Sequence, residues 1–467
     1  MTTASPASPG PGIAALAAAF DARTFVPDDA IPEKYLTDWS GLSAVRPLAL
    51  LRPATTADVA EALRICHRHD VAVVPQGGLT GLCGGARPIA GAVALSLERL
   101  TGIEEIDVAG ATVTVRAGTP LETVQAAAAA NGLYMPLDLG ARGSCTIGGN
   151  IATNAGGNRV IRYGMTRDLV LGLEVVLADG TVITSLNRMI KNNAGYDVKQ
   201  AFIGSEGTLG IVTRAVLRLS PLPVFSSAAV CAVEDFAAVV ELLSRARRDL
   251  GSMLSAFEVM WADYWELIAT TPGLRMPLSP GHPFYVLVEV QGTDENHDGA
   301  KFDAFLEGTA EAGLLADAVV ARSIGDLKAF WEVRDAVSEF PRTFGAHVPF
   351  DIGLPIGRMD AFVGACRAAL RDAIPDVAAL FYGHVGDGNL HIVARDRSRA
   401  EQPKHEICDI VYRLVGEFGG TVSAEHGIGI SKMEWLGLTR SPLEIEAMRR
   451  LKAAFDPKNL LNPGKVF

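Results

Sequence analysis

The sequence predicts an α+β protein in which a domain with two glycine-rich loops is followed by a domain built on an antiparallel sheet. Three observations predict it. The chain has 467 residues, enough for two or three domains with large cores. Strands and two glycine-rich stretches alternate before residue 222, and strands alternate with helices after it. We therefore expect an N-terminal tail and lead-in helix at 1–45, a first domain at 46–222, a second at 223–420, and a returning C-terminal segment at 421–467.

Composition excludes several classes of protein. Charged residues make up 20% of the chain and hydrophobic residues 49%, as in globular proteins. The net charge is −11 and no basic run occurs, which argues against nucleic acid or an anionic membrane surface as the main partner. No apolar run reaches the roughly 18 residues that a membrane span needs. A small anionic ligand would have to be bound by local positive groups.

The cysteines and the N-terminus indicate the compartment. Six cysteines are scattered without a CxxC pair, which fits a reducing environment without a disulfide framework. The opening "MTTASPASPGPG" has no basic region followed by an apolar core and is typical of a short disordered tail rather than a signal peptide. The cytoplasm is the expected location.

The first glycine-rich stretch, "QGGLTGLCGG", lies between two predicted strands. An amphipathic helix, "TADVAEALRICHRHD", precedes them and places Val59, Leu63 and Cys66 on one face. The strands are "VAVVP" and "GAVALSL". This order differs from a Rossmann loop, which joins a strand to a helix with GxGxxG spacing. Five glycines in nine residues would let the backbone aim N–H groups at phosphate oxygens. A plain long hairpin loop explains the segment equally well.

The second stretch, "PLDLGARGSCTIGGNIATNAGGNRVIRYG", mixes glycines with small polar residues. Such side chains allow close packing of a planar ligand and hydrogen bonds to its edge. Strand character on both sides argues against low complexity. "LVLGLEVVLADGTVIT" predicts a hairpin turning at Asp179-Gly180, and "FIGSEGTLGIVTRAVLRLSP" predicts a further loop and strand. Residues 46–222 therefore form one domain.

Two of the nine histidines flank an Asp-Gly pair in "FYGHVGDGNLHIV". Asp387-Gly388 predicts a two-residue hairpin turn, which would place His384 opposite His391. Opposed residues lie on one face with Cβ atoms about 4.5–5.5 Å apart. Two imidazoles at this separation can share a metal ion, although for two histidines alone a pair at a sheet edge is favoured. A third ligand would reverse that preference.

Six motifs together resemble one enzyme family. They are "PQGGLTGLCGG", "CTIGGNIATNAGG", "YDVKQAFIGSEGTLGIVT", "GHVGDGNLH", "SAEHGIGISK" and "FDPKNLLNPGK". The chain is similar to the FAD-linked 2-hydroxyacid dehydrogenases of the vanillyl-alcohol-oxidase-like flavoproteins, with the D-lactate and D-2-hydroxyglutarate dehydrogenases nearest. The resemblance covers nearly the whole chain after the tail, with the motifs in the family's order. It implies a two-subdomain FAD-binding domain and an α/β cap domain with an antiparallel sheet.

The resemblance also implies the residues that bind FAD. The first glycine-rich loop would cradle the FAD pyrophosphate, and the second would line the ribityl and isoalloxazine portions. The later segment with Gly210 and Val212 would lie at the adenine side. In chain order the expected cofactor-binding residues are Pro75, Gly77, Gly78, Thr80, Gly81, Gly143, Cys145, Thr146, Gly148, Gly149, Asn154, Ala155, Gly210, Val212 and Asn462. Many relatives attach FAD through a histidine in the first loop. None occurs between Pro75 and Gly85, so we expect FAD to be bound non-covalently.

The second domain would bind the substrate. Its strands and helices suit an antiparallel sheet with helices on one face. In "DLKAFWEVRDAVSEF", Arg334 and Ser338 are four residues apart and would share a helix face. A guanidinium grips a carboxylate through two hydrogen bonds, and Arg334 matches the family's W-x-x-R position. A solvated helix arginine is the alternative. The resemblance adds Asn389 as a substrate-binding residue.

Two departures concern the substrate side chain. D-2-hydroxyglutarate dehydrogenases have a lysine where this chain has Pro349, and an asparagine common after the second metal histidine is Val393 here. Both groups contact substrate in the relatives that the chain resembles. Their absence weakens the case for 2-hydroxyglutarate, although His347 is a candidate to replace the lysine.

"SAEHGIG" supplies the third metal ligand and a base. Glu425 would join His384 and His391, and three ligands leave a vacant position on a zinc-like ion, as in catalytic sites. A divalent cation lowers the pKa of a bound hydroxyl, and His426 would take its proton. Hydride would then pass from the substrate α-carbon to flavin N5. Asp387 is expected to be only a turn residue.

The sequence thus predicts an FAD-dependent oxidoreductase that converts a D-2-hydroxy acid of the D-2-hydroxyglutarate, D-malate or D-lactate class to the 2-oxo acid. Its electron acceptor would be an electron-transfer flavoprotein, a quinone or a cytochrome. A homodimer is the candidate assembly of the chain. A zinc-dependent hydrolase using the same three ligands is the alternative, but it leaves the glycine-rich loops unexplained. A non-catalytic nucleotide-binding module leaves the metal-like constellation unexplained.

Overall fold

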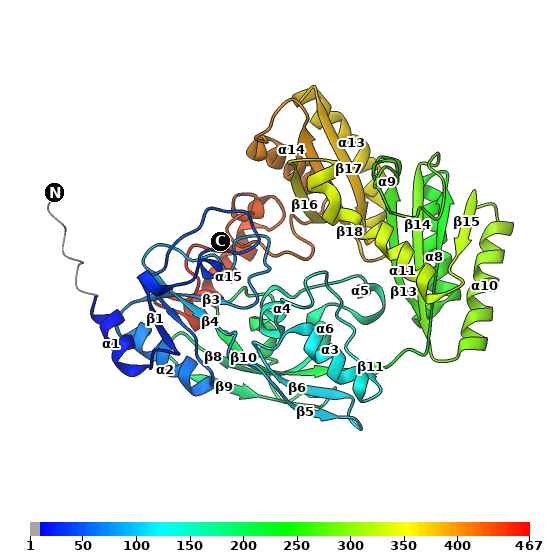
Figure 1. The fold of residues 1–467 in the computed structure, drawn as a ribbon. Coiled ribbons are helices and arrows are strands. Elements are labelled where there is room, and N and C mark those ends of the chain that lie inside the picture. Colours follow the sequence, from blue (N-terminus) through cyan, green and yellow to red (C-terminus); the bar gives the residue numbers. More distant parts are fainter. Residues whose placement is uncertain (1–9) are drawn as a thin grey trace. The chain divides into compact units, whose positions relative to one another are not determined.

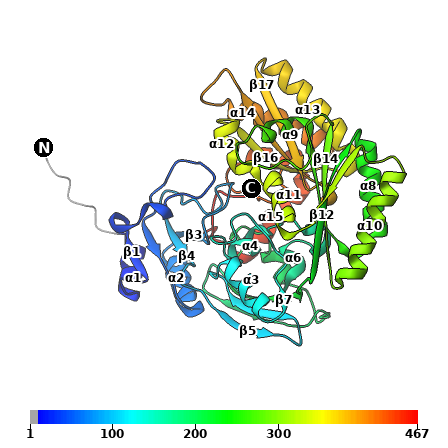
Figure 2. The same cartoon turned by 45° about the vertical axis from the view of Figure 1, so that its right-hand side comes forward.

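The computed structural model describes residues 10–467, which form two compact units (Figure 1, Figure 2). The first unit comprises residues up to 157, 165–222 and 425–467; the second comprises 158–164 and 223–424. The sequence placed boundaries at 222 and 420 and did not anticipate segment 158–164. Most of the predicted tail, residues 1–9, lies outside the described residues. Its last two residues, Pro11 and Gly12, instead begin helix α1 (Pro11–Ala19), because proline suits the first turn of a helix.

The first sheet of the first unit has the order β1-β2-β4-β3. Its strands are β1 (Phe25–Pro27), β2 (Ala49–Leu51), β3 (Ala72–Gln76) and β4 (Ala92–Ser96). Helix α2 (Thr56–Arg68) begins at a capping box of Thr55 and Asp58 and buries the predicted Val59, Leu63 and Cys66. β3 and β4 are parallel, so the first glycine-rich loop is not a hairpin.

The second sheet of this unit has the order β5-β6-β10-β8-β9 and is antiparallel throughout. Its strands are β5 (Ile103–Asp107), β6 (Thr112–Arg116), β8 (Val170–Val176), β9 (Val182–Ser185) and β10 (Ile211–Arg218). β8 and β9 form the hairpin predicted at Asp179-Gly180, where Gly180 has a φ of +84° that suits glycine. The unit therefore contains the two predicted subdomains.

Short elements and the C-terminus complete this unit. They are the helices α3 (Leu121–Ala130), α4 (Ile147–Thr153), α6 (Thr166–Leu169), α7 (Lys199–Phe202) and α15 (Pro442–Phe455), the 3₁₀ turns η1 (Asp28–Ala30), η2 (Glu33–Tyr35) and η7 (Met433–Leu438), and the paired strands β7 (Leu133–Tyr134) and β11 (Ser220–Pro221). After α15 the chain returns to the first sheet, where Leu461 bridges Val73 in parallel. The C-terminal motif thereby lies beside the strand that leads into the first loop.

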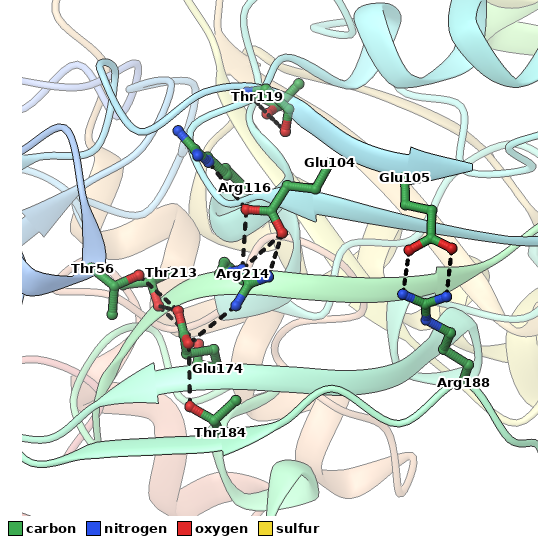
Figure 3. Close-up of polar contacts among 11 residues, drawn as sticks. Thr56, Glu104, Glu105, Arg116, Thr119, Glu174, Thr184, Arg188, Thr213 and Arg214 are labelled. Atoms are coloured by element: carbon green, nitrogen blue, oxygen red, sulfur yellow. Dashed lines mark hydrogen bonds and ion pairs between the residues drawn. The ribbon is translucent and has the colours of Figure 1, made fainter. Parts of the chain in front are cut away.

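A charged network ties α2 to the second sheet (Figure 3). Glu174 of β8 is 7% exposed and accepts hydrogen bonds from Thr56 at 2.7 Å, Thr213 at 3.0 Å and Thr184 at 3.2 Å. Arg214 donates to it at 3.4 Å. A buried carboxylate is tolerated only when it is hydrogen-bonded in this way.

The second unit is built on a seven-stranded antiparallel sheet of order β15-β12-β14-β13-β17-β18-β16. Its strands are β12 (Phe225–Val233), β13 (Leu254–Trp261), β14 (Phe284–Gly292), β15 (Asp317–Val320), β16 (Val348–Gly353), β17 (Val377–Gly383) and β18 (Asn389–Asp396). The antiparallel sheet was predicted from sequence and is confirmed.

Helices cover both faces of this sheet, which corrects the expectation of a single covered face. They are α5 (Val160–Tyr163), α8 (Phe236–Asp249), α9 (Ala262–Ala269), α10 (Glu295–Glu311), α11 (Ile324–Arg334), α12 (Phe340–Thr343), α13 (Met359–Ala373) and α14 (Lys404–Glu417), with 3₁₀ turns η3 (Gly251–Met253), η4 (Ala336–Glu339), η5 (Ile356–Arg358) and η6 (Val385–Asp387). Neighbouring residues of β14 show the two faces. Phe284 contacts Phe236 of α8, whereas Tyr285 stacks on Trp265 of α9.

All six cysteines are buried, and none of them forms a disulfide. Within residues 10–467, no helix combines the length and the apolar character that crossing a bilayer requires.

Candidate active site

The first glycine-rich loop presents free backbone donors. Among the described residues, none accepts a hydrogen bond from the N–H groups of Gly77 to Gly81, and Leu79 has a φ of +60° that non-glycine residues rarely adopt. Successive unpaired N–H groups in such a turn form a concavity that binds anions. Strained backbone at this position is typical of a functional loop. The loop therefore fits the pyrophosphate of a dinucleotide cofactor.

The two glycine-rich loops lie against each other within the first unit. A Cβ atom at Gly77 would lie 2.7 Å from Thr146 Oγ1, and one at Gly78 would lie 2.0 Å from the Ser144 carbonyl oxygen. Only glycine allows this approach. Two buried acceptors beside the loops, Gln76 Oε1 and Asn462 Oδ1, have no partner among the described residues. The chain thus provides both donors and acceptors for FAD.

Other predicted cofactor residues already have contacts within the protein. Asn154 caps α4 with a φ of +50°, and its Oδ1 accepts a hydrogen bond from Arg167 N at 2.8 Å. A Cβ at Gly210 would clash with Val175, and Val212 is buried in the core of the second sheet. Cys145 is buried beside Asn150. FAD contacts at these residues remain predictions.

Lys465 is a buried cation beside the first loop. Its Nζ donates to the carbonyl oxygens of Gly85 at 2.8 Å and Arg87 at 2.7 Å. Burial lowers its pKa to about 7. Asn462 Nδ2 also donates to Gly85 O, at 3.0 Å. The C-terminal motif thus holds the end of the first loop in place.

Glu206 anchors the loop that carries Glu425 and His426. Its two oxygens accept hydrogen bonds from the backbone N–H groups of Ile428 and Gly429, each at 2.8 Å. Glu206 has a φ of +52°, and burial raises its pKa. All of these residues belong to the first unit. The sequence analysis assigned no such role to "GSEGT", although a glutamate close to two glycines in a buried segment is an unusual pattern.

The histidine hairpin exists, but its predicted register is wrong. β17 and β18 pair antiparallel, yet His391 lies opposite Tyr382 and not His384. Three residues, Val385 to Asp387, form the 3₁₀ turn η6 between the strands, so the connection is longer than the predicted two-residue turn. The two imidazole rings nevertheless lie 5.3 Å apart between centroids. The second unit therefore brings the two predicted histidine ligands together.

Asp387 lies in the η6 turn and is exposed, as expected of a turn residue. Its Oδ1 accepts a hydrogen bond from Asn389 N at 3.3 Å. This carboxyl lies on the η6 turn beside His384, so it belongs to the surroundings of the histidine pair.

Arg334 ends α11 and is buried, with 5% of its surface exposed. Its Nε donates to Glu258 Oε2 at 2.8 Å, and its Nη2 lies 3.1 Å from His384 Nε2. Glu258 Oε1 lies 2.7 Å from His384 Nδ1. Burial by itself would raise the pKa of Glu258, but His384 and Arg334 lower it to about 2. The alternative of a solvated helix arginine is therefore wrong.

Ser338 does not share a face with Arg334. α11 ends at Arg334, and a 3₁₀ turn, η4 (Ala336–Glu339), follows it. The four-residue spacing of an α-helix no longer applies across this break, and Ser338 is exposed. The sequence-based assignment of Ser338 to a common face is wrong.

Asn389 lies on the same face of β18 as His391, two residues along the strand. Its Nδ2 donates to Asp351 Oδ1 at 2.7 Å, and its buried Oδ1 has no partner among the described residues. The other Asp351 oxygen accepts from Ser423 Oγ at 3.3 Å. Asn389 thus keeps an acceptor for a ligand.

The two departures from the family pattern lie directly opposite each other. Pro349 of β16 pairs with Val393 of β18, on the strand face that carries His391. His347 packs edge-on against Phe340, and its Nδ1 donates to the Gly345 carbonyl oxygen at 2.6 Å. The position is therefore apolar, with one half-buried histidine beside it.

Glu258 is a second residue whose role the sequence analysis missed. It lies on β13, whose eight residues are all buried and which the sequence analysis did not assign. A charged residue within the apolar run "LSAFEVMW" was the available signal, because buried carboxylates are rare unless paired.

Comparisons with known proteins show the family of the chain. Residues 222–466 match the family described as "FAD linked oxidases, C-terminal domain", and residues 47–185 match "FAD binding domain". The chain is 41% identical to a mitochondrial D-2-hydroxyglutarate dehydrogenase of Bos taurus over 92% of this chain and 78% of the relative. It is 40% identical to a D-2-hydroxyglutarate dehydrogenase of Xanthomonas citri pv. viticola over 98% and 97%. A putative mitochondrial D-lactate dehydrogenase of Schizosaccharomyces pombe is 36% identical over 94% and 85%.

Solved structures share the fold at low identity. Alkyldihydroxyacetonephosphate synthase gives a TM-score of 0.76 at 16% identity, covering 99% of this chain and 86% of that one. p-Cresol methylhydroxylase gives 0.75 at 17%, covering 97% and 96%. They confirm the predicted fold class.

Proposed function

Because this chain belongs to the family of FAD-linked oxidases, we propose that it oxidises a D-2-hydroxy acid to the corresponding 2-oxo acid. The observation that carries the proposal is Arg334. This guanidinium is buried, and its Nη2 lies 3.1 Å from a histidine nitrogen, His384 Nε2. A 2-hydroxy acid presents a carboxylate and a hydroxyl on adjacent carbons, which suits a cation beside an imidazole.

The residues have distinct roles in the proposed reaction. Arg334 binds the substrate carboxylate, and Asn389 uses its free Oδ1 to orient the substrate. His426 accepts the hydroxyl proton as general base. The α-hydrogen leaves with its electron pair, so the carbon becomes a carbonyl. Bound FAD supplies the acceptor for this hydride at N5.

The metal site belongs to the same proposal. The short distance between the His384 and His391 rings, 5.3 Å between centroids, supports these two residues as ligands. Glu425 is the third ligand expected from the sequence. A zinc ion at these residues would supply positive charge that favours loss of the hydroxyl proton. Three ligands leave one position for substrate, as in catalytic zinc sites.

Flavin chemistry provides the first test. The purified protein should be yellow and should bleach anaerobically with a D-2-hydroxy acid but not with the L-enantiomer. Acid precipitation should release the flavin into the supernatant, because no histidine lies in the first loop. A yellow pellet would contradict non-covalent binding. Protein that binds FAD but bleaches with none of D-lactate, D-malate and D-2-hydroxyglutarate would contradict the proposed substrate class.

Chelation tests the metal. Removing it should abolish bleaching while leaving the yellow colour and the melting temperature nearly unchanged, and added zinc or manganese should restore activity. His384→Ala and His391→Ala should mimic the chelated protein. His426→Ala should keep the metal and lose about 10²- to 10⁴-fold in rate. Fully active protein with less than one metal per chain would remove the metal from the mechanism.

The substrate side chain follows from Pro349 and Val393. Neither supplies a polar group, so we expect little preference for dicarboxylates over D-lactate. A strong preference for D-2-hydroxyglutarate or D-malate would show that His347 or another group binds the second carboxylate.

Partner and location remain predictions. An electron-transfer flavoprotein, a quinone or a cytochrome would reoxidise the flavin. The sequence predicts a cytoplasmic location, whereas two of the relatives are named mitochondrial. The comparisons give no support to the hydrolase alternative.

A further inference from the structure

Residues 158–164 form a short excursion of the chain into the second unit. The chain leaves the first unit after Gly157 and returns to it at Met165. The excursion contains the short helix α5, and the sequence analysis assigned no function to any of its residues. Its side chains are nevertheless bound within the second unit, so these contacts indicate what the excursion does there.

Glu289 of β14 is the centre of these contacts. It is 1% exposed, and burial of a carboxylate is costly unless its oxygens are hydrogen-bonded. Arg159 donates to both oxygens, from Nε at 2.9 Å and from Nη2 at 3.0 Å, which is the paired geometry that a guanidinium forms with a carboxylate. Ser255 Oγ donates to Oε1 at 2.6 Å, and Trp331 Nε1 donates to Oε2 at 2.7 Å. Each oxygen of Glu289 is therefore hydrogen-bonded to Arg159 and to one further side chain.

Trp331 connects this carboxylate to the candidate active site. It lies on α11, partly buried against the core of the second unit, and Arg159 Cζ lies 5.7 Å from the centroid of its ring. Indole Nε1 can only donate a hydrogen bond, so its bond to Glu289 fixes the orientation of the ring. Arg334 follows three residues later on the same helix, and residues at this spacing are neighbours on a helix surface. The place of Arg334 therefore depends on how Trp331 is held.

The end of α11 is where such an anchor matters. The Asp335 N–H donates to the Trp331 carbonyl oxygen at 2.7 Å and closes the last turn. Tyr264 Oη donates to the carbonyl oxygens of Val333 at 2.9 Å and Arg334 at 2.8 Å. The chain then changes to the 3₁₀ turn η4, so the α-helix does not continue past Arg334 to stabilise this turn from the other side. A displaced Trp331 would thus move the backbone that carries Arg334.

The excursion also supports the turn beside the histidine pair. A Cβ atom at Gly386 would lie 2.8 Å from Ile161 Cδ1, so the Ile161 side chain packs directly on turn η6. Turn η6 follows His384, and α11 carries Arg334. Residues 158–164 therefore contact one element next to each of these predicted site residues.

We propose that Arg159, Glu289 and Trp331 form an anchor that fixes the last turn of α11, so that Arg334 meets the carboxylate of a 2-hydroxy acid in a defined place. The three residues are positioning residues that act through Arg334. The proposal rests on the proposed function for the role of Arg334. Its statement about α11 is independent of the substrate, because the anchor is formed by residues of this chain alone.

The experiment compares Trp331→Phe with Trp265→Phe as FAD-loaded full-length protein. Trp331→Phe keeps an aromatic side chain on α11 but removes the N–H that Glu289 accepts. Trp265 is the matched control, because its Nε1 also donates one hydrogen bond, to the Leu278 carbonyl oxygen at 3.3 Å, and it lies on α9. We expect Trp331→Phe to raise KM on the order of 10-fold, with kcat and FAD content near the parent values, because a displaced carboxylate-binding group weakens substrate and transition state alike. Trp265→Phe should lower the melting temperature without raising KM.

Three further measurements separate the anchor from general stability. Arg159→Lys keeps the charge but loses the paired hydrogen bonds, so it should raise KM by a smaller factor. In an Arg334→Lys background, Trp331→Phe should add little, because both changes act through the same guanidinium. The backbone amides of residues 331–335 should exchange with deuterium faster in Trp331→Phe and Arg159→Lys than in the parent, and at the parent rate in Trp265→Phe.

Several results would overturn the proposal. A parent-like KM in Trp331→Phe would show that the anchor does not position Arg334, and if this variant does not fold, a parent-like KM in Arg159→Lys would show the same. An equal rise of KM in Trp265→Phe would indicate a general effect of losing an indole N–H. A full additional loss in the Arg334→Lys background would mean that Trp331 acts by another route. If the parent oxidises no 2-hydroxy acid, the proposed function fails, and amide exchange alone decides whether the anchor fixes α11.

Discussion

Glu174 in the first unit and Glu258 in the second are both buried carboxylates beside an arginine, but their other partners differ in kind. Glu174 accepts from three threonine hydroxyls and Arg214 (Figure 3). Arg214 is in turn paired with Glu104 at 2.9 Å. Glu258 pairs with Arg334 and His384, which also lie 3.1 Å from each other, Nη2 to Nε2. The first carboxylate thus belongs to a closed network of hydroxyls and arginine, and the second joins a predicted substrate-binding arginine to a predicted metal ligand.

A cavity beside the Glu174 network sharpens this difference. Its volume is about 310 Å³, and Thr56, Glu104, Arg116 and Arg214 are among its lining residues. Each arginine on its wall already pairs with a glutamate, and Arg116 Nε donates to Glu104 Oε1 at 3.1 Å. Because these arginines are already paired with glutamates, their charges contribute to stability and offer little to a ligand.

Arg334→Lys should give the largest effect on activity. Lysine keeps the charge but loses the planar fork and the Nε contact to Glu258. Hydrogen bonds to charged groups contribute about 1.5–3 kcal/mol, so kcat/KM should fall about 10- to 150-fold, mostly through KM. Arg214→Lys is the matched control and should leave KM unchanged. Similar losses in both variants would break the comparison.

Glu174→Ala should reduce stability and not turnover. It leaves three hydroxyls and part of Arg214 without their acceptor, at a cost of about 2 kcal/mol. Thermal unfolding and turnover per bound flavin measure the two quantities separately. A fall in turnover per flavin at an unchanged melting temperature would give Glu174 a functional role that its closed network does not suggest.

Lys465 supplies a pH-dependent effect on stability. The unfolded lysine keeps its proton up to about pH 10.5 and the folded one only up to about 7, so between these values the unfolded state binds more protons. Stability should therefore rise with pH in this window, by up to about 1.4 kcal/mol per pH unit. Lys465→Met cannot titrate, so its melting temperature relative to the parent should fall between pH 7 and pH 9.5. A constant difference would contradict the lowered pKa.

Thr56→Val should give the smallest effect. It removes one donor to Glu174 Oε1, and Thr213 still satisfies that oxygen. The expected loss is about 0.5–1.5 kcal/mol, measured as a shift of the denaturant midpoint. A loss as large as that of Glu174→Ala would show that α2, not the carboxylate, dominates the network.

Local patterns in the sequence predicted much of the fold. Periodicity located α2, and alternation with turn residues located the β8–β9 hairpin. The composition of the two glycine-rich stretches predicted a ligand cradle, and the structure adds its free N–H groups. These features depend on residues near one another in the chain, so the sequence carries them directly.

The errors arose where local rules met tertiary packing. Arg334 and Ser338 were assigned one face because helices repeat every 3.6 residues, but the chain changes to a 3₁₀ turn after Arg334. The Asp-Gly pair predicted a tight turn, but η6 shifts the register and places His391 opposite Tyr382. The histidines still meet, because His384 extends from the end of β17.

The sequence by itself determined the fold class, the family and the candidate ligands, because motif order, periodicity and turn chemistry are properties of contiguous residues. Only the tertiary structure decided which side chains meet. Glu206 reaches Ile428 across 222 residues, and Glu258 reaches His384 across 126. Each contact depends on how strands and loops distant in sequence are packed, and a buried carboxylate takes as partners whichever donors that packing brings to it.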